Sequence, residues 1–235
     1  MLQTAKNLLK DLLESAHVDD GHGIDHAQTV LHHATRALQL TNLPDETQLA
    51  IKLAALLHDA DDHKFFPDNN DNENTKCILN AINLSKETRN LVIKMINLVS
   101  CSKNRNTPAN PEWLLIPRAA DRLEAMGYIG IKRCYDYTKH TTGTSKSRPL
   151  FTNTTPRATN IKELNSIATA ERFEKYRGGS DSMIDHFYDK VLHLVDLKIN
   201  NKYLQSVATE RHAILVDFCL EFGKTGKVPY IENTL

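Results

Sequence analysis

The sequence predicts an all-α protein, a bundle of helices in a single domain. Apolar residues recur at helical spacing along most of the chain, and no stretch alternates apolar and polar residues for the length of a strand. The 235 residues suffice for one large core or two modest ones. Neither an internal repeat nor an interdomain linker is visible. We therefore expect one domain over residues 1–235.

In the first half of the chain, several segments have helical spacing. Residues 2–16 form an amphipathic pattern, and the stripe over 27–38 ends at a turn in 41–46. Residues 47–58 are apolar nearly all round, which is typical of a central buried helix. Two further helices and a loop are expected, in order, at 75–83, 86–100 and 102–111.

The second half begins with one long helical pattern over 113–137, in which Gly127 and Gly130 would allow close contact between helices. Residues 138–160 are rich in Thr and long for a structureless loop, so they form either a solvated surface excursion or a lid over a site. The remaining helices are expected at 161–176, 182–199 and 204–222, the last one stopped by Gly223.

The composition excludes several classes of protein. Lys plus Arg and Asp plus Glu both number 29, so the formal net charge is zero, which argues against nucleic acid and membrane surfaces as partners. The amphipathic N-terminus is unlike a signal peptide, and no apolar stretch approaches the length of a membrane span. Single cysteines indicate reduced thiols and a cytoplasmic protein; they are Cys77, Cys101, Cys134 and Cys219.

Charged residues gather where the central helix ends. Residues 53–66 read LAALLHDADDHKFF, so an apolar run leads directly into His58 and Asp59, with Asp61 and Asp62 behind them. Burying part of such a cluster costs several kcal/mol unless the charges are paired or bound to metal. The end of this helix is therefore a candidate site.

Two other helices carry residues of the same kinds. His26 lies in HGIDHAQTV and Asp121 in AADRLEAMG. With His58 and Asp59 they supply two imidazoles and two carboxylates from three helices, a set that suits an octahedral divalent ion with two positions left for water or substrate. Each residue taken alone is as readily a surface histidine or a capping or ion-paired aspartate.

The order of these motifs resembles the HD superfamily of metal-dependent phosphohydrolases, and in particular its small stand-alone members of bacterial type. The similar segments extend from about residue 20 to 222 and include ALLHDADDHKF, ADRLEAMGYIGIKR, SMIDHFYDKVLHL and ATERHAILVDF. The resemblance implies a helical bundle around a metal site. It also implies an Mn, Mg, Co, Ni or Fe ion whose ligands are His26, His58, Asp59 and Asp121.

Further roles follow from this site. Asp62, one helical turn beyond His58, would orient or deprotonate the attacking water. Lys64, Arg122 and Arg133 would neutralise phosphate oxygens, unless they form ordinary salt bridges. The expected substrate contacts, on the helical face of His26 and in the 138–160 segment, are His22, Arg148 and Arg157.

The chain departs from the pattern of these relatives at three positions. Where they tend to read HDWxHxxRV, Gly23 replaces an acid and Thr29 replaces an arginine; where they read DADRL, Ala119 replaces an aspartate. None of these positions is an expected metal ligand. The changes affect groups that support ligands or contact substrate, which can cost roughly 10–100-fold in affinity or activity.

We expect a phosphohydrolase acting on a small-molecule nucleotide, first a (deoxy)nucleoside triphosphate that releases pyrophosphate. The alternatives are hydrolysis of a nucleoside monophosphate or guanosine tetraphosphate, a non-catalytic module that binds metal or nucleotide, and a di-iron HD oxygenase. An oxygenase would need more ligands between the tetrad members, where residues 62–120 offer only His63 as a further histidine. Monomer and homodimer both stay open.

Overall fold

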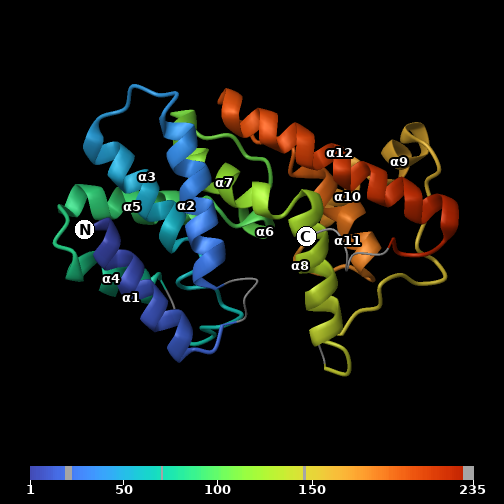
Figure 1. Ribbon diagram of the computed structural model, residues 1–235, viewed down its shortest axis with the longest axis horizontal. Coiled ribbons are helices and arrows are strands. Elements are labelled where there is room, and N and C mark those ends of the chain that lie inside the picture. The colour runs from blue at the N-terminus through green and yellow to red at the C-terminus, as the bar shows by residue number, and fades with distance from the viewer. Residues whose placement is uncertain (19–22, 70, 145–146, 230–235) are drawn as a thin grey trace. The chain divides into compact units, whose positions relative to one another are not determined.

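The computed structural model describes residues 1–18, 23–69, 71–144 and 147–229, and their regular structure is entirely helical (Figure 1). This confirms the all-α prediction. None of the described helices is both long and apolar enough to cross a bilayer. The elements are α1 (Leu2–Ser15), α2 (Ile24–Leu38), α3 (Asp45–Leu57), α4 (Glu73–Ala81), α5 (Lys86–Asn97), α6 (Cys101–Asn104), η1 (Glu112–Leu115), α7 (Ile116–Glu124), α8 (Gly127–His140), α9 (Ile161–Ile167), α10 (Ala170–Lys175), α11 (Met183–Asp189), η2 (Val191–His193) and α12 (Lys202–Thr225).

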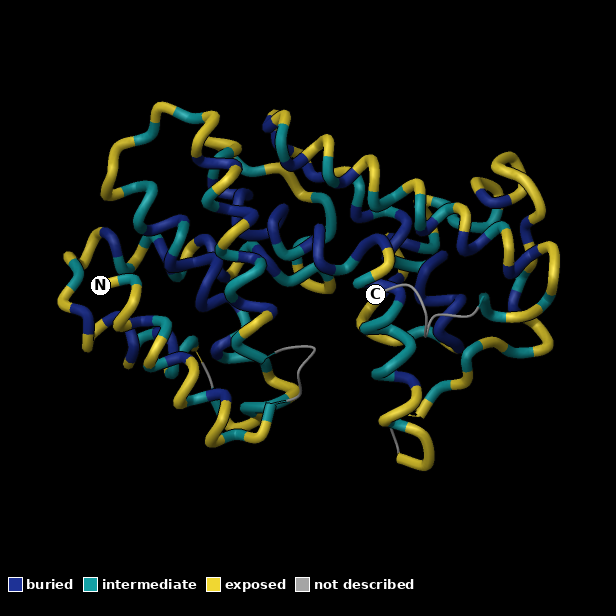
Figure 2. Tube along the Cα trace, viewed as in Figure 1, coloured by how far each residue is buried: buried dark blue, intermediate teal, exposed yellow. Residues whose placement is uncertain are grey.

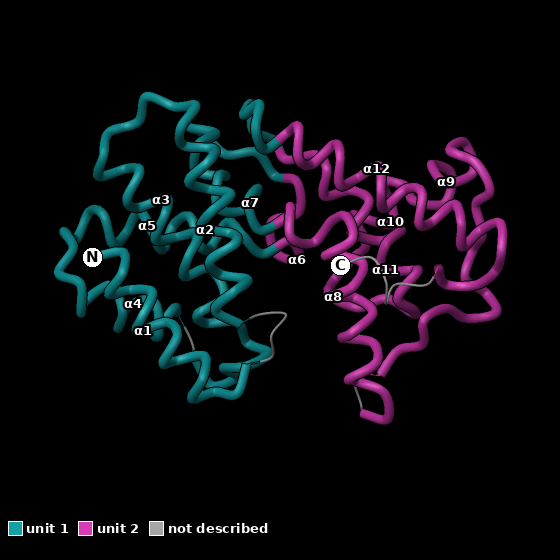
Figure 3. The backbone as a smooth tube through the Cα atoms, in the orientation of Figure 1, with its two compact units in different colours: residues 1–100, 107–121, 198–204 teal, residues 101–106, 122–197, 205–235 magenta. Residues whose placement is uncertain are grey.

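The helices form two compact units, which Figure 3 distinguishes by colour. Unit 1 consists of residues 1–100, 107–121 and 198–204, and unit 2 consists of residues 101–106, 122–197 and 205–235. The chain alternates between the units, and α7 and α12 each contain residues of both. The expectation of one domain over the whole chain stays a prediction.

Helix α3 is the centre of unit 1, as its all-round apolar pattern predicts. It packs against α1, α2 and α5, and its path is mostly buried from Ala50 onward (Figure 2). Burying each leucine contributes about 1.5–3 kcal/mol relative to leaving it exposed. The buried residues of α3 are Ala50, Ile51, Leu53, Ala54, Ala55, Leu56 and Leu57. The helix then ends at Leu57, with His58 as its C-cap.

The C-terminal end of α2 is held by the short return segment 198–204 of unit 1. The Asn201 side-chain amide donates to the carbonyl oxygen of Ala37 at 3.0 Å. One turn earlier, the Tyr203 hydroxyl lies 2.7 Å from Nδ1 of the buried His33. Because these contacts fix one end of α2, they also limit the movement of His26 near its other end.

In unit 2, α11 is the buried helix, and it packs against α8, α10 and η2. Its buried Asp185 accepts hydrogen bonds from the hydroxyls of Ser182 at 2.6 Å and Thr155 at 2.9 Å. The guanidinium of Arg172 lies 3.1 Å from Asp185 and 2.6 Å from Asp189. This network satisfies the buried carboxylate, as burial requires.

Parts of the 138–160 segment are anchored within unit 2, although many of its residues are exposed. Its first residues, through His140, are the end of α8. The carbonyl oxygens of Pro149 and Leu150 then accept the backbone N–H groups of Met183 and Ile184 at 3.0 and 3.1 Å, which satisfies donors at the N-terminus of α11. Ala158 is fully buried. Residues 145 and 146 lie outside the described part of the chain.

Some predicted helices are divided at positions where the spacing of apolar residues does not indicate a break. The expected helix over 113–137 is interrupted between α7 and α8, where Gly127 has φ +68°. A Cβ on Gly127 would lie 3.0 Å from Cγ of Arg211 in α12, so a close approach between helices is confirmed there. At Gly130 a Cβ would instead meet the carbonyl oxygen of Ala125, which precedes α8. The segment 161–176 is divided before Thr169, whose hydroxyl caps α10.

Two C-terminal expectations are wrong. Residues 182–199 are not one helix, because α11 ends at Asp189 and only the short η2 follows. Gly223 does not stop the last helix, since α12 continues to Thr225 and Gly226, with φ +68°, comes after it. Gly223 has another use: a Cβ there would lie 1.8 Å from the carbonyl oxygen of Ala158.

We predict that Gly223→Ala lowers the free energy of unfolding by about 3 kcal/mol, because the new methyl group collides with backbone that cannot rotate away. Urea denaturation followed by circular dichroism measures the change. The control is Gly179→Ala, where a Cβ meets no atom within 4 Å and stability should stay the same. Equal stability of both variants would contradict the close packing of Ala158 on α12.

Candidate metal centre

Three segments of unit 1 bring two imidazoles and two carboxylates together. His26 comes from the first turn of α2, His58 and Asp59 from the residues that follow α3, and Asp121 from α7. The imidazoles are buried, with 4% and 1% of the His26 and His58 side chains exposed. The carboxylates of Asp59 and Asp121 are 26% and 29% exposed. The cluster is therefore closed on the histidine side and open on the carboxylate side.

The distances within the cluster suit a shared cation. Oδ2 of Asp59 lies 3.7 Å from Nε2 of His26 and 3.3 Å from Nε2 of His58. Oδ1 of Asp121 lies 3.5 Å from Nε2 of each histidine. In an octahedral site with bonds of about 2.1 Å, neighbouring ligands are about 3.0 Å apart and opposite ligands about 4.2 Å apart. The observed separations between imidazole and carboxylate fall between these values. His26, His58 and Asp59 offer ligand atoms that all lie within 4.8 Å of one another, so they could hold a divalent ion, with Asp121 beside both histidines.

The hydrogen bond on the far side of His58 supports this interpretation. Its Nδ1 lies 2.9 Å from the carbonyl oxygen of Ala55, one turn back along α3. A carbonyl oxygen only accepts, so Nδ1 carries the hydrogen and donates it. In the neutral ring Nε2 then presents a lone pair to the two carboxylates. The lone pair and the negative carboxylates repel each other, so this arrangement is stable only with a proton or a metal ion between them.

Electrostatics show the same need for positive charge. Burial acts to lower the pKa of His58, but the charge of Asp59 and the contact with Asp121 outweigh it, and the pKa lies well above its usual value. Burial acts to raise the pKa of Asp59 and of Asp121, and the two histidines outweigh it, so both carboxyls have lowered pKa values. A metal ion and this proton would compete for the same place.

Solved structures resemble the chain over nearly its whole length. A Lactobacillus plantarum protein is 25% identical, with a TM-score of 0.70 and 94% of each chain covered. An HD-superfamily hydrolase from Bacillus thuringiensis has a TM-score of 0.64, 23% identity and 95% of each chain covered. Bacillus subtilis YpgQ, solved in complex with ADP, has a TM-score of 0.64 and 21% identity and covers 98% of this chain and 96% of its own. The shared fold is that of the HD superfamily.

No protein-family model matches the chain. An uncharacterized protein of Acanthamoeba polyphaga mimivirus is 38% identical over 225 residues, which cover 88% of this chain and 90% of the viral one. The chain is an HD-fold protein of this viral protein's family. The HD fold agrees with the fold that the sequence motifs implied.

The three positions at which this HD-fold protein departs from its relatives lie on or next to α2 and α7, the helices that carry His26 and Asp121. Gly23 is the N-cap of α2 and provides no capping side chain. The Thr29 hydroxyl donates to the carbonyl oxygen of Asp25 within α2. Ala119 is fully buried in α7. None of the three removes a residue of the cluster.

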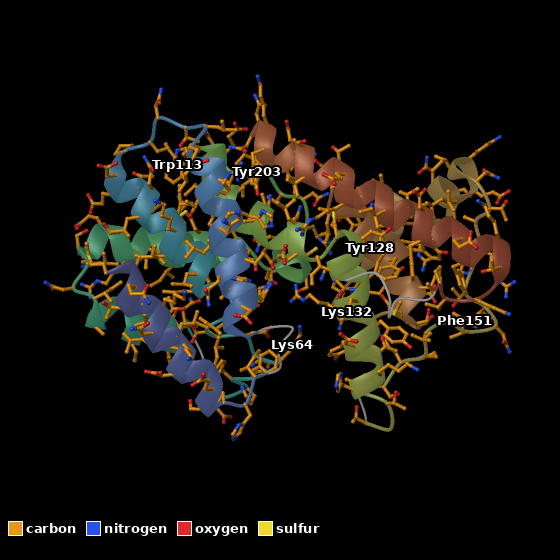
Figure 4. The ribbon with its side chains drawn as sticks, in the orientation of Figure 1. Lys64, Trp113, Tyr128, Lys132, Phe151 and Tyr203 are labelled. Carbon is orange, nitrogen blue, oxygen red and sulfur yellow. The ribbon has the colours of Figure 1, made fainter. Side chains whose placement is uncertain are left out.

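The structure corrects the placement of Asp62. Helix α3 ends before it, and residues 58–62 form turns, in which the Asp62 amide donates to the carbonyl oxygen of Asp59 at 3.1 Å. Asp62 Oδ1 accepts the backbone N–H of Lys64 at 3.0 Å, and Nζ of Lys64 lies 3.7 Å from Oδ2. Lys64 projects from the loop after α3 and is 52% exposed (Figure 4). The catalytic roles of Asp62 and Lys64 stay predictions.

The contacts of Arg122 indicate a structural role, and its predicted role at phosphate stays a prediction. Its guanidinium is buried in unit 2 and donates to Asn106 Oδ1 at 2.8 Å and to the carbonyl oxygen of Asp196 at 3.1 Å. It also donates to the carbonyl oxygen of Arg105. Successive residues of a helix point in different directions, so Asp121 faces the cluster while Arg122 supports two loops of unit 2.

The expected substrate contacts are not tested by the structure. His22 lies outside the described residues. In unit 2, Arg133 donates to the carbonyl oxygen of Glu124 at 3.2 Å. The guanidinium of Arg148 lies over the Tyr137 ring at 5.4 Å, and that of Arg157 lies over the Phe222 ring at 5.9 Å. Stacking orients these groups and leaves their charge in place.

We predict that Arg122→Met lowers the free energy of unfolding by about 2–4 kcal/mol, because buried carbonyl groups lose their donors. Denaturant unfolding measures the change. The Michaelis constant of any phosphohydrolase activity should stay within about twofold of the wild-type value, since the side chain has no place at substrate. A raised Michaelis constant with normal stability would restore the phosphate role.

Proposed function

We propose that the protein is a divalent-metal-dependent phosphohydrolase whose metal is held by His26, His58, Asp59 and Asp121. The cluster of these side chains is the observation that carries the proposal. Four donors leave two positions of an octahedral ion for water and substrate, and the partial exposure of both carboxylates gives access to them. The HD-superfamily hydrolase among the structures of the same fold supports this reaction class.

In this proposal a bound ion supplies Lewis acidity at a phosphoryl oxygen and lowers the pKa of a water. The protein residues then do the positioning and the proton transfer. The Asp62 carboxylate, oriented by the Lys64 backbone amide, takes the proton of the attacking water. Lys64 balances charge on the phosphate, because its exposed ammonium group is held only loosely, at 3.7 Å from Asp62.

The proposed substrate is a nucleotide, first a (deoxy)nucleoside triphosphate that is split to a monophosphate and pyrophosphate. The complex of YpgQ with ADP supports a nucleotide for a protein of this fold. Arg133, Arg148 and Arg157 are proposed to contact the phosphates. A nucleoside monophosphate or guanosine tetraphosphate is the alternative substrate.

The same cluster also bears on two other classes of function, a di-iron oxygenase and a non-catalytic binding module. Among the residues that the structure describes, His26, His58 and Asp59 form the one group of three or more possible metal-ligating side chains within short reach of one another. A second iron would need additional His or Asp ligands between the members of the cluster, and the further histidine there, His63, is exposed. This disfavours a di-iron oxygenase. A non-catalytic binding module differs from the leading proposal only in turnover.

The experiment uses protein stripped of metal by chelation and resupplied separately with Mn²⁺, Mg²⁺, Co²⁺, Ni²⁺ or Fe²⁺. Each form is given nucleoside mono-, di- and triphosphates and guanosine tetraphosphate, and products are separated by anion exchange. Pyrophosphate release from triphosphates supports the proposal. Orthophosphate release from a monophosphate, or turnover of guanosine tetraphosphate, indicates the alternative substrates. Metal and nucleotide binding without turnover indicates a binding module.

We predict that Asp59→Ala weakens Mn²⁺ binding by more than about 100-fold and abolishes turnover, because no neighbouring group replaces the lost carboxylate. Metal content after gel filtration and calorimetric titration with Mn²⁺ measure the loss. Full occupancy in this variant would overturn the metal assignment. The matched control is Asp62→Asn, which removes a charge from the same turn and should keep the metal.

We predict that Asp62→Asn lowers kcat by about 100-fold or more, the usual worth of a positioned base. The amide still accepts a hydrogen bond from Lys64 but takes up no proton from water. Steady-state kinetics with metal occupancy checked in the same sample give the answer. A normal kcat with bound metal would identify Asp62 as a surface acid.

A further inference from the structure

The turn that carries Asp59 is tied to the N-terminus of α4 by the neighbouring Asp61. Oδ1 of Asp61 accepts the backbone N–H of Asn74 at 2.8 Å and the side-chain amide of Asn69 at 3.1 Å. Oδ2 accepts the backbone N–H of Thr75 at 3.0 Å and the Thr75 hydroxyl at 2.7 Å. A carboxylate has about four lone-pair sites, so these donors occupy all of them. Asp61 therefore has no site left for a metal ion or a water.

These bonds replace the usual cap of α4. The residue at the N-cap, Asn72, makes no capping hydrogen bond with its side chain. The first N–H groups of a helix need acceptors from outside it, and a negative charge there is also favoured by the helix dipole. From the turn after α3, Asp61 supplies the acceptor oxygens and the negative charge. Because α4 packs against α1 and α5, the carboxylate is anchored to the core of unit 1.

The backbone on both sides of Asp61 is fixed as well. The Ala60 carbonyl oxygen accepts the side-chain amide of Asn74 at 2.8 Å, and the Ala60 N–H donates to Leu57 at 3.0 Å. The Asp62 N–H donates to Asp59 at 3.1 Å. The peptide units of this short turn have few free rotations left, so the direction of the Asp59 and Asp62 side chains depends on where α4 holds Asp61.

We propose that Asp61 is a positioning residue, which acts through α4 to set the Asp59 carboxylate at the metal and the Asp62 carboxylate at the attacking water. The inference rests on the proposed function. The rival explanation is that Asp61 is a helix cap with no effect on the site. The two explanations differ in the affinity for metal, which a remote cap leaves unchanged.

The experiment perturbs this link from both ends. Asp61→Asn keeps the size of the side chain but replaces one acceptor oxygen by a donor, and Thr75→Val removes one donor from the fully buried partner. Thr75→Ser restores the hydroxyl. The matched control is Ser85→Ala, which removes the cap of α5, where the Ser85 hydroxyl accepts the N–H of Thr88 at 3.1 Å. Each protein is titrated with Mn²⁺ by calorimetry, and thermal unfolding is recorded without metal.

We expect Asp61→Asn to weaken Mn²⁺ binding about 10–100-fold, as loss of a group that orients a ligand does. Thr75→Val should weaken it about 3–10-fold, the net worth of one typical hydrogen bond, and Thr75→Ser should bind nearly as the wild type does. Ser85→Ala should lower the unfolding midpoint and bind Mn²⁺ normally. With saturating Mn²⁺ and nucleotide, kcat of Asp61→Asn should stay at least about tenfold low, because Asp62 is misplaced too.

The inference is overturned if Asp61→Asn and Thr75→Val behave as Ser85→Ala does, with a lower unfolding midpoint and normal Mn²⁺ affinity. Should Asp61→Asn fail to fold, Thr75→Val and its serine counterpart decide the question alone. If the wild-type protein itself binds no Mn²⁺, the proposed function fails. If the wild type and both variants bind Mn²⁺ equally, only the positioning role fails.

Discussion

The rest of unit 1 is organised around a cluster that needs a positive charge. Two buried imidazoles face two carboxylates at separations of 3.3–3.7 Å, and the hydrogen bond from His58 to Ala55 directs a lone pair toward the acidic side. Buried charges without partners cost several kcal/mol, so such an arrangement persists only if a proton or a metal ion joins the groups. A protein gains nothing in stability from this design that an apolar cluster would not provide. The arrangement is therefore better explained by function.

The surrounding helices act to keep this cluster in place. The core around α3 fixes the end from which His58 and Asp59 project. The contacts of Asn201 and Tyr203 hold the far end of α2, and the bonds to Asp61 hold the turn that follows α3. The segments that carry His26, His58 and Asp59 are thus fixed by contacts outside the cluster itself. If the site binds an ion as proposed, such support would keep its geometry without the ion and so favour binding over collapse.

The sequence predicts the helical class, the central helix and the four residues of the cluster, because periodicity and motif order depend on residues near one another in the chain. It does not predict the break before Gly127, where the backbone turns to φ +68° and Arg211 of α12, far away in the chain, approaches closely. Nor does the sequence show that Asp61 and Asp62 have different hydrogen-bond partners. The two aspartates are adjacent, and they differ in the donors that face them, which come from residues 64, 69, 74 and 75. The structural contacts of Arg122 are not predicted for the same reason, because its acceptors lie at residues 105, 106 and 196.

A comparison of buried and exposed cations explains why Lys64 suits the proposed reaction. The guanidiniums of Arg118 and Arg122 are buried and donate to backbone carbonyl oxygens, so moving them would cost several kcal/mol. Lys64 is 52% exposed and pairs with Asp62 at 3.7 Å, and an exposed ion pair of this kind is worth about 0–1 kcal/mol. Exchanging Asp62 for a phosphate would therefore cost Lys64 little, as its proposed role requires.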